Sequence, residues 1–261
     1  MLHYKKQTGF TLIELIITIV VIGIMVMGIA GFIELGTKGY ADTVDRQQLQ
    51  NQARFVVEKL TREIRHAVPN SFSVFNNGTG ECLSFYPIDY SGAYVMLEQG
   101  EGVSDRFRFV IVNSISSPGA NNLENKKMVI NPATPDDLDT ANSNQSIVLS
   151  GVAKDESNDF YSIEFDEEFN SGNVVPSPAS RLYIYSHQVT YCQQGTQLTR
   201  QIDTQAPIQV GEDVELADFA DGTADGEDAL SRSALIHLRL LFLRGDERSN
   251  YENDVQVLNV P

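Results

Sequence analysis

A single carboxylate lies inside a long apolar stretch near the start of the chain. Glu14 is the only charged residue in the 24 residues of the run 10–33. As a helix this run would extend about 36 Å, which is enough to span a hydrocarbon core of about 30 Å. A charge at the bilayer centre costs at least ~2.5 kcal/mol, so this carboxylate needs a partner and marks a candidate functional site.

Two lysines at positions 5 and 6 precede the apolar run and favour a cytoplasmic N-terminus. Residues 9–14, Gly-Phe-Thr-Leu-Ile-Glu, resemble the prepilin cleavage and methylation motif of type IV pilins and type II secretion pseudopilins. The resemblance implies that a prepilin peptidase cuts after Gly9 and methylates Phe10. It also implies that Glu14 pairs with the N-terminal amine of a neighbouring subunit during assembly, which supplies the missing partner.

Three other interpretations of this stretch fit the residues less well. A secretory signal peptide would be cut near residues 28–30, Gly-Ile-Ala, but its apolar core is about 7–15 residues long and Glu14 would interrupt it. A plain single-pass anchor explains the length of the run but leaves Glu14 unexplained. A buried core helix is disfavoured because the run is long and apolar on every side.

The helix is predicted to continue beyond the membrane run. Residues 40–67 contain no proline and no interior glycine, and their apolar residues recur at steps of three and four, as on one helical stripe. The stripe consists of Val44, Leu49, Ala53, Val56, Val57, Leu60, Ile64 and Ala67. The opposite face carries Asp45, Arg46, Arg54, Glu58, Lys59, Arg62 and Glu63. Pro69 is expected to end the helix.

After Pro69 the apolar pattern changes to a period of two, which is typical of strands. Strands are predicted over 81–86, 93–98, 105–112, 146–150, 160–165, 181–186, 188–192, 197–202, 234–243 and 254–260. Their inward-facing residues would include Phe107, Phe109, Ile111, Ile236, Leu238, Leu240 and Phe242. Residues 193–196 are predicted to form a hairpin turn, and residues 113–144 and 217–228 to form loops.

The expected fold class is therefore α+β, with a long N-terminal helix packed on a mostly antiparallel β-sheet head, as in pilins. Four parts follow along the chain. They are a leader peptide (1–9), a transmembrane and assembly helix (10–34), its amphipathic continuation (35–68) and a β-rich periplasmic head (69–261).

Charge and cysteine usage limit the functions of the head. The net charge is −16, which argues against nucleic acid as a partner. The two cysteines, Cys82 and Cys192, both follow the membrane run. In an oxidising periplasm such a pair is expected to form a disulfide, which would stabilise the fold by about 4–5 kcal/mol in the chain-entropy model.

Few residues point to a metal or to catalysis. The acidic stretch with Asp218, Asp221 and Asp225, followed by Glu227 and Asp228, offers hard oxygen ligands for calcium, but a solvated acidic loop is the better explanation. The sequence has no nucleophile elbow, phosphate loop or paired-histidine motif. We therefore expect no cofactor and no enzymatic activity.

A second resemblance concerns the late part of the head. Residues 188–192, Gln-Val-Thr-Tyr-Cys, and 198–200, Leu-Thr-Arg, are similar to the late hairpin of large minor pilins and of the minor pseudopilin J class. Together with the paired cysteines and continuous helix, they resemble minor components of the mannose-sensitive haemagglutinin (MSHA) pilus.

This resemblance implies a minor pilin of the inner membrane with a periplasmic head, which enters the pilus when assembled. Its expected partners are the prepilin peptidase, other minor and major pilins and the pilus assembly platform. Three alternatives remain, namely a minor pseudopilin of a type II secretion system, a tip adhesin and a membrane-anchored periplasmic enzyme.

Overall fold

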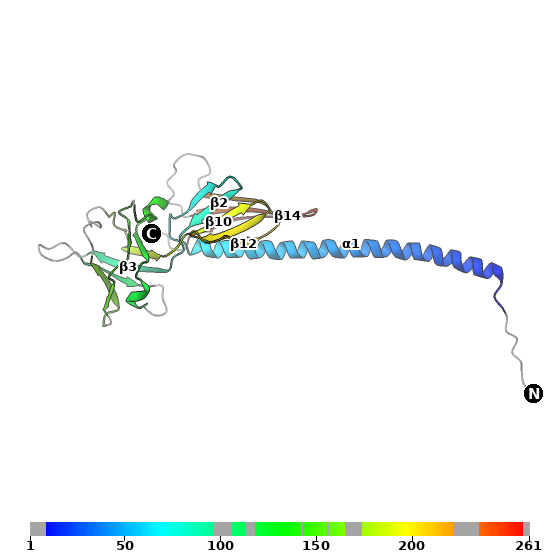
Figure 1. The fold of residues 1–261 in the computed structure, drawn as a ribbon, viewed down its shortest axis with the longest axis horizontal. Helices are drawn as coiled ribbons and strands as arrows, with labels where there is room; N and C mark the ends of the chain where they lie inside the picture. The colour runs from blue at the N-terminus through cyan, green and yellow to red at the C-terminus, as the bar shows by residue number, and fades with distance from the viewer. Residues whose placement is uncertain are drawn as a thin grey trace, which may run out of the picture. The chain divides into compact units, whose positions relative to one another are not determined.

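The chain folds as one long helix followed by antiparallel sheets, which confirms the predicted α+β class (Figure 1). The computed structural model describes residues 9–96, 106–112, 118–141, 143–155, 157–164, 174–221 and 235–257. Helix α1 runs without interruption over the 54 residues Leu12–Arg65. After its last turn, the hydrogen bonds span three residues and not four, from His66 N to Glu63 O and from Ala67 N to Ile64 O.

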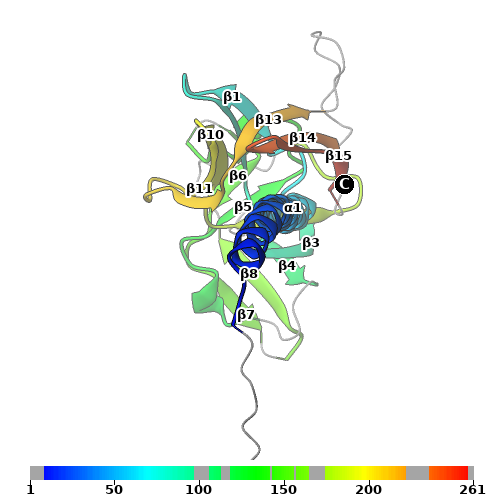
Figure 2. The same ribbon diagram turned by 90° about the vertical axis from the view of Figure 1, so that its right-hand side faces the viewer.

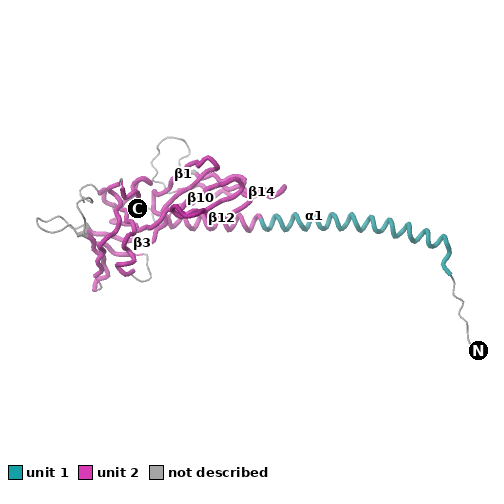
Figure 3. The backbone as a smooth tube through the Cα atoms, in the orientation of Figure 1, with its two compact units in different colours: residues 1–48 teal, residues 49–261 magenta. Residues whose placement is uncertain are grey.

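The structure divides after Gln48 into two compact units (Figure 3). The first unit contributes the apolar part of α1, and the second contains Leu49 onward, including the rest of α1 and all the strands. Five residues of α1 are buried, and all of them belong to the second unit: Leu49, Ala53, Val56, Leu60 and Ile64. These residues come from the stripe that the sequence predicts.

Two sheets pack against this part of α1. The five-stranded sheet has the order β1-β2-β10-β11-β12, and the three-stranded sheet has the order β13-β14-β15. Their strands are β1 (Ser73–Asn76), β2 (Glu81–Phe85), β10 (Val189–Gln194), β11 (Gln197–Ile202), β12 (Ile208–Gly211), β13 (Val214–Asp221), β14 (Leu235–Arg244) and β15 (Glu247–Gln256). Figure 2 shows β13–β15 on one side of α1 and β10–β11 on another.

One apolar core joins α1 to both sheets. It combines the buried helix residues with β2, β10, β11 and β13–β15. Ile236, Leu238, Leu240 and Phe242 all point into it, as the alternation of β14 predicts. The predicted hairpin is also present, because Gln194 pairs with Gln197 and Gly195 turns the chain with a φ of 62°, which glycine adopts without strain.

The third sheet has seven strands in the order β6-β5-β9-β3-β4-β8-β7. Its strands are β3 (Tyr90–Met96), β4 (Arg106–Ile111), β5 (Lys127–Ile130), β6 (Ser146–Val148), β7 (Ala153–Asp155), β8 (Phe160–Glu164) and β9 (Arg181–Tyr185). It lies beyond the C-terminal end of α1 in Figure 1, whereas β2, β10 and β14 lie alongside the helix. Phe107 and Phe109 are buried in its own core, as predicted, and Ile111 is partly buried.

Two predicted loops are wrong in part. Residues 113–144 contain β5 and two 3₁₀ helices, η1 (Ala120–Asn122) and η2 (Pro135–Leu138). The short run Met128–Val129–Ile130 is buried on both faces of the sheet, so it shows no alternation, and proline and asparagine signals surround it. Residues 113–117 and 142 lie outside the described residues.

The acidic loop predicted at 217–228 begins as strand β13. Ala217 and Phe219 point into the core, and Asp218 occupies the outer face between them. The acidic residues concealed this alternation, and residues 222–228 lie outside the described part of the chain. Three further short strands, β1, β7 and β12, were not predicted, and β15 begins seven residues before the predicted start.

Candidate functional site

The cleavage motif lies at the very start of the helix. Gly9, Phe10 and Thr11 precede α1 and are exposed. No atom beyond the adjacent residues approaches within 4 Å of the position that a Cβ on Gly9 would take. The bond after Gly9 is therefore in non-helical, accessible backbone, which is the form in which a protease can bind a peptide as an extended strand.

Thr11 caps the helix, a role that was not predicted. Its Oγ1 accepts a hydrogen bond of 3.4 Å from the backbone N–H of Glu14, and its carbonyl accepts one of 3.2 Å from Leu15 N. Threonine followed three residues later by glutamate is the capping-box signature, so the sequence did contain the signal. Glu14 thus lies in the first helical turn, where the helix dipole favours a negative charge.

The Glu14 carboxylate is exposed and available for an external partner. Among the described residues, no hydrogen bond or ion pair to this side chain is present. The rest of the apolar run is exposed as well, and α1 is long and apolar enough to cross a membrane. Its threonine hydroxyls need no outside partner, because Thr18 donates to Leu15 O and Thr37 to Ile33 O. Glu14 is therefore an exposed acidic group at the start of this apolar region, without a partner among the described residues.

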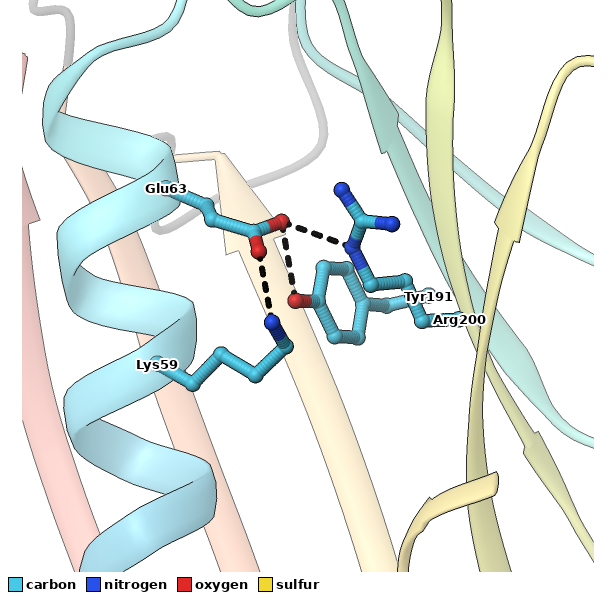
Figure 4. Close-up of polar contacts among 4 residues, drawn as sticks. All are labelled: Lys59, Glu63, Tyr191 and Arg200. Atoms are coloured by element: carbon cyan, nitrogen blue, oxygen red, sulfur yellow. Dashed lines mark hydrogen bonds and ion pairs between the residues drawn. The ribbon is translucent and has the colours of Figure 1, made fainter. Parts of the chain in front are cut away.

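A polar cluster joins α1 to the five-stranded sheet (Figure 4). Glu63 Oε2 accepts hydrogen bonds from Tyr191 Oη at 2.9 Å and from Arg200 Nε at 3.0 Å, and Glu63 Oε1 pairs with Lys59 Nζ at 3.0 Å. The sequence placed Lys59 and Glu63 on the outer face of the helix. The structure shows instead that the Glu63 side chain is only 18% exposed.

Electrostatics explain why this carboxylate stays charged. Burial acts to raise the pKa of Glu63, but hydrogen bonds from Lys59, Arg200 and Tyr191 outweigh it and leave the pKa below its ordinary value. Burial raises the pKa of Tyr191, and the Glu63 charge raises it further. The cluster is therefore a neutral tyrosine between fixed charges. It orients this part of α1 on the sheet.

The two cysteines form a disulfide across adjacent strands. Cys82 on β2 and Cys192 on β10 are direct partners in the antiparallel ladder, with Cα atoms 4.1 Å apart and a separation of 110 positions in sequence. The flanking residues tie the same strands to β13. Glu81 Oε1 accepts a 2.7 Å bond from Phe219 N, and Gln193 Oε1 accepts a 2.8 Å bond from Ala217 N.

Of the three calcium candidates, only Asp218 has a side chain that the structure describes. Asp218 pairs in the ladder with Arg239, and Asp221 is the last residue of β13, while Asp225 lies outside the described part of the chain. Within the described ranges, no group of three or more histidine, cysteine, aspartate or glutamate side chains is arranged to hold a metal ion. Asp218 instead acts on Glu81, whose pKa is raised by burial and by the Asp218 charge.

Comparison with known proteins adds one finding, at the N-terminus. Residues 4–30 match the family model of the prokaryotic N-terminal methylation motif. No curated protein and no solved structure shows significant similarity to the chain. The matched segment contains Gly9, Phe10 and Glu14 and runs into the exposed apolar part of α1. The motif and the helix together support a type IV pilin-like or pseudopilin role for this chain, with processing by a prepilin peptidase and anchoring in a membrane.

Proposed function

We propose that the chain is a minor pilin-like structural subunit that takes part in the biogenesis of a type IV pilus of the MSHA type, in the position of the MshO component. It acts by assembly and not by catalysis. The observation that carries this proposal is the methylation motif at residues 4–30, placed at the start of one continuous helix whose later part packs under a β-sheet head.

Processing comes first. The peptidase removes residues 1–9 and methylates the new N-terminal Phe10, at a site where the backbone is exposed and not yet helical. The capping bond from Glu14 N to Thr11 Oγ1 lies on the mature side of the cut, so the helix start survives cleavage. Until assembly, the subunit stays in the inner membrane with its head in the periplasm, where Cys82 and Cys192 can oxidise.

Assembly then moves the apolar helix from lipid into a bundle of sibling helices. Glu14 has no partner among the described residues, and the methylated amine of a neighbouring subunit neutralises it. The exposed apolar residues of α1 are buried by the helices of other minor and major pilins as the assembly platform extracts the subunit. The pairing of charges sets the register of the helices, and apolar burial supplies the stabilisation.

A minor pseudopilin of a type II secretion system is the second candidate, because the same N-terminal motif serves both systems. A bacterial strain that has both a type IV pilus and a type II secretion system, and from which the gene for this chain is deleted, distinguishes the two candidates. Complementation by the full chain should restore surface pili, and the Glu14→Ala variant should insert into the membrane normally but fail to restore them. Restored enzyme secretion without pili would instead assign the chain to the secretion system. Normal piliation by Glu14→Ala as the sole copy would contradict the assembly role of Glu14.

A further inference from the structure

The seven-stranded sheet is an insertion in the chain. All seven of its strands lie between β2 and β10, and those two strands are direct antiparallel neighbours, with Phe85 opposite Val189. A chain that passed straight from β2 to β10 would simply form a hairpin. We call residues 86–188 the inserted module, and residues 49–85 together with 189–257 the body.

The inserted module and the body have separate cores. The body core combines α1 with β2, β10, β11 and β13–β15, and the module core is built from aromatic and aliphatic residues of its own strands. Phe109, for example, stacks on Tyr161 within the module, while Leu240 packs only in the body core. No ladder in the described ranges joins a strand of the seven-stranded sheet to a strand of the body.

Module and body belong to one compact unit and are connected by one apolar cluster and a set of hydrogen bonds. A cluster of five buried residues bridges them, with Val68 from the end of the helix against Val129, Leu138, Tyr183 and Tyr185. A short backbone bridge pairs Ala67 with Pro87. Hydrogen bonds at the two chain connections add to it, with Tyr86 and Ile88 bonded to the end of the helix and Gln188 bonded to Asp203 in both directions. Farther from the connections, the Asn70 amide donates to Pro132 O at 2.8 Å. Tyr185 donates its hydrogen bond to Leu138 O at 2.7 Å, which is a contact within the module and not with the body. The apolar cluster at the interface therefore contains fewer buried residues than the core of the body or the core of the module.

We propose that the inserted module opens and closes as a unit independent of the body, and that the Cys82–Cys192 disulfide isolates the body from this opening. When the module unfolds, it becomes a flexible loop between Phe85 and Val189. The entropy of closing so long a loop opposes the pairing of β2 with β10. The disulfide spans 110 residues and keeps this loop closed in both states, so opening of the module no longer weakens that pairing.

The residues beside the disulfide extend this isolation to the three-stranded sheet. Glu81 and Gln193 hold the free edge of β13 through Phe219 N and Ala217 N. Their position depends on the register of β2 and β10. Without the disulfide, loss of that register would also break these two bonds, and β13 would then be held only by its ladder with β14 and by the body core. The body, which carries the assembly helix, is thus protected from events in the module.

Hydrogen exchange on the full chain in detergent tests both parts of the proposal. The first variant is Phe109→Ala in the module core, and the matched control is Leu240→Ala in the body core. Each is measured with the disulfide intact and in a Cys82→Ser/Cys192→Ser background. With the disulfide, Phe109→Ala should speed exchange in β3, β4 and β8 by roughly 100-fold and leave β2, β10 and β14 unchanged. Leu240→Ala should speed exchange in β2, β10 and β14 and leave β3, β4 and β8 unchanged.

In the serine background, the effect of Phe109→Ala should spread to β2, β10 and β13. Faster exchange in β2 and β14 with the disulfide intact would show one cooperative head and overturn the proposal. Confinement of the effect to the module in both backgrounds would overturn the isolating role of the disulfide. If Phe109→Ala does not accumulate, wild-type protein in mild denaturant provides the same test. Module peptides must then open at a lower denaturant concentration than body peptides, and simultaneous opening contradicts the proposal.

Discussion

Tyr191 on β10 and Glu63 on α1 are joined by a hydrogen bond of 2.9 Å between the phenol and a largely buried carboxylate. Arg200 on β11 reaches the same carboxylate oxygen, so one helical side chain is held by two neighbouring strands. Apolar packing alone would let α1 rotate or slide over the sheet. The two directed bonds favour one rotation and one position of the segment 49–65 of α1 along the sheet.

Replacing Glu63 by glutamine should lower the free energy of unfolding by about 2 kcal/mol, because Arg200 and Lys59 lose the charge that they face. Thermal unfolding of the full chain in detergent, followed by the near-ultraviolet circular dichroism of tyrosine, measures the loss. Glu58→Gln, on the exposed side of the same helix, is the control and should change little. Equal effects of the two variants would show that the cluster does not anchor the helix.

The stability difference between wild type and Glu63→Gln should depend on pH. Because the pKa of Glu63 is lower in the folded than in the unfolded chain, the folded state binds fewer protons. The stabilisation is complete above the ordinary pKa of 4.5 and disappears as pH falls through the folded value. Melting curves from about pH 7 down to about pH 3 should therefore converge for the two proteins. A difference that stays constant over this range would contradict the assignment.

Glu81→Gln should stabilise the fold, whereas Glu63→Gln should destabilise it. Burial and the Asp218 charge raise the pKa of Glu81, so its ionised form is disfavoured in the folded state at neutral pH. Glutamine still offers an oxygen to Phe219 N but carries no charge. The variant should unfold at a slightly higher temperature, with a gain of about 0.5 kcal/mol near pH 7 that fades in acid. A clear destabilisation would mean that the charge is required to hold β13.

Gly92→Ala should disrupt the inserted module. A Cβ at this position in β3 would overlap the carbonyl oxygen of Val110 on the paired strand β4. This oxygen belongs to the backbone of a strand in the ladder and cannot move aside easily. The expected loss is about 2–3 kcal/mol of module stability, read by hydrogen exchange in β3 and β4. Gly119→Ala is the control, because its Cβ would meet no atom within 4 Å. Similar exchange in the two variants would rule out the steric explanation.

A bulky residue at Gly9, such as leucine, should block maturation. The peptidase must bind the backbone closely on both sides of the bond, and glycine leaves that approach open. Co-expression with the peptidase and mass spectrometry of the N-terminus distinguish the full-length form from the form that begins at methylated Phe10. Gly39→Leu, farther along α1, should be processed as in wild type. Normal cleavage of Gly9→Leu would remove the basis for the prepilin assignment.

The main architecture could be predicted from sequence because it depends on periodic patterns. The long apolar run that follows Glu14 defines the first part of α1. The three-and-four spacing from Leu49 to Ile64 and the alternation in β14 each define an element and its buried face. Strand β5 escaped prediction because Val129 and its neighbours are buried on both faces and show no alternation. In β13, the acidic residues around Asp218 resembled a loop until the partners of Ala217 and Phe219 were known.

The polar contacts could not be predicted, because they join distant parts of the chain. Glu63 and Arg200 are 137 residues apart, and nothing in either segment indicates the other. The same holds for Glu81 and Phe219. Thr11 is the exception, because its partner lies three residues away and the capping signature was readable. Polar contacts between near neighbours could thus be predicted from the sequence, whereas those that depend on the order of strands in the sheets became visible only in the structure.

The crosslinked β2–β10 pair has a practical consequence for engineering. Its two strand ends lie side by side and are covalently fixed, so they form a ready attachment point for a foreign domain whose own termini are close together. Such a cargo, spliced in place of residues 86–188, would leave the ladder between β2 and β10 and the body core around α1 in place. In the pilus proposed above, the chain would then serve as a carrier that displays a chosen polypeptide.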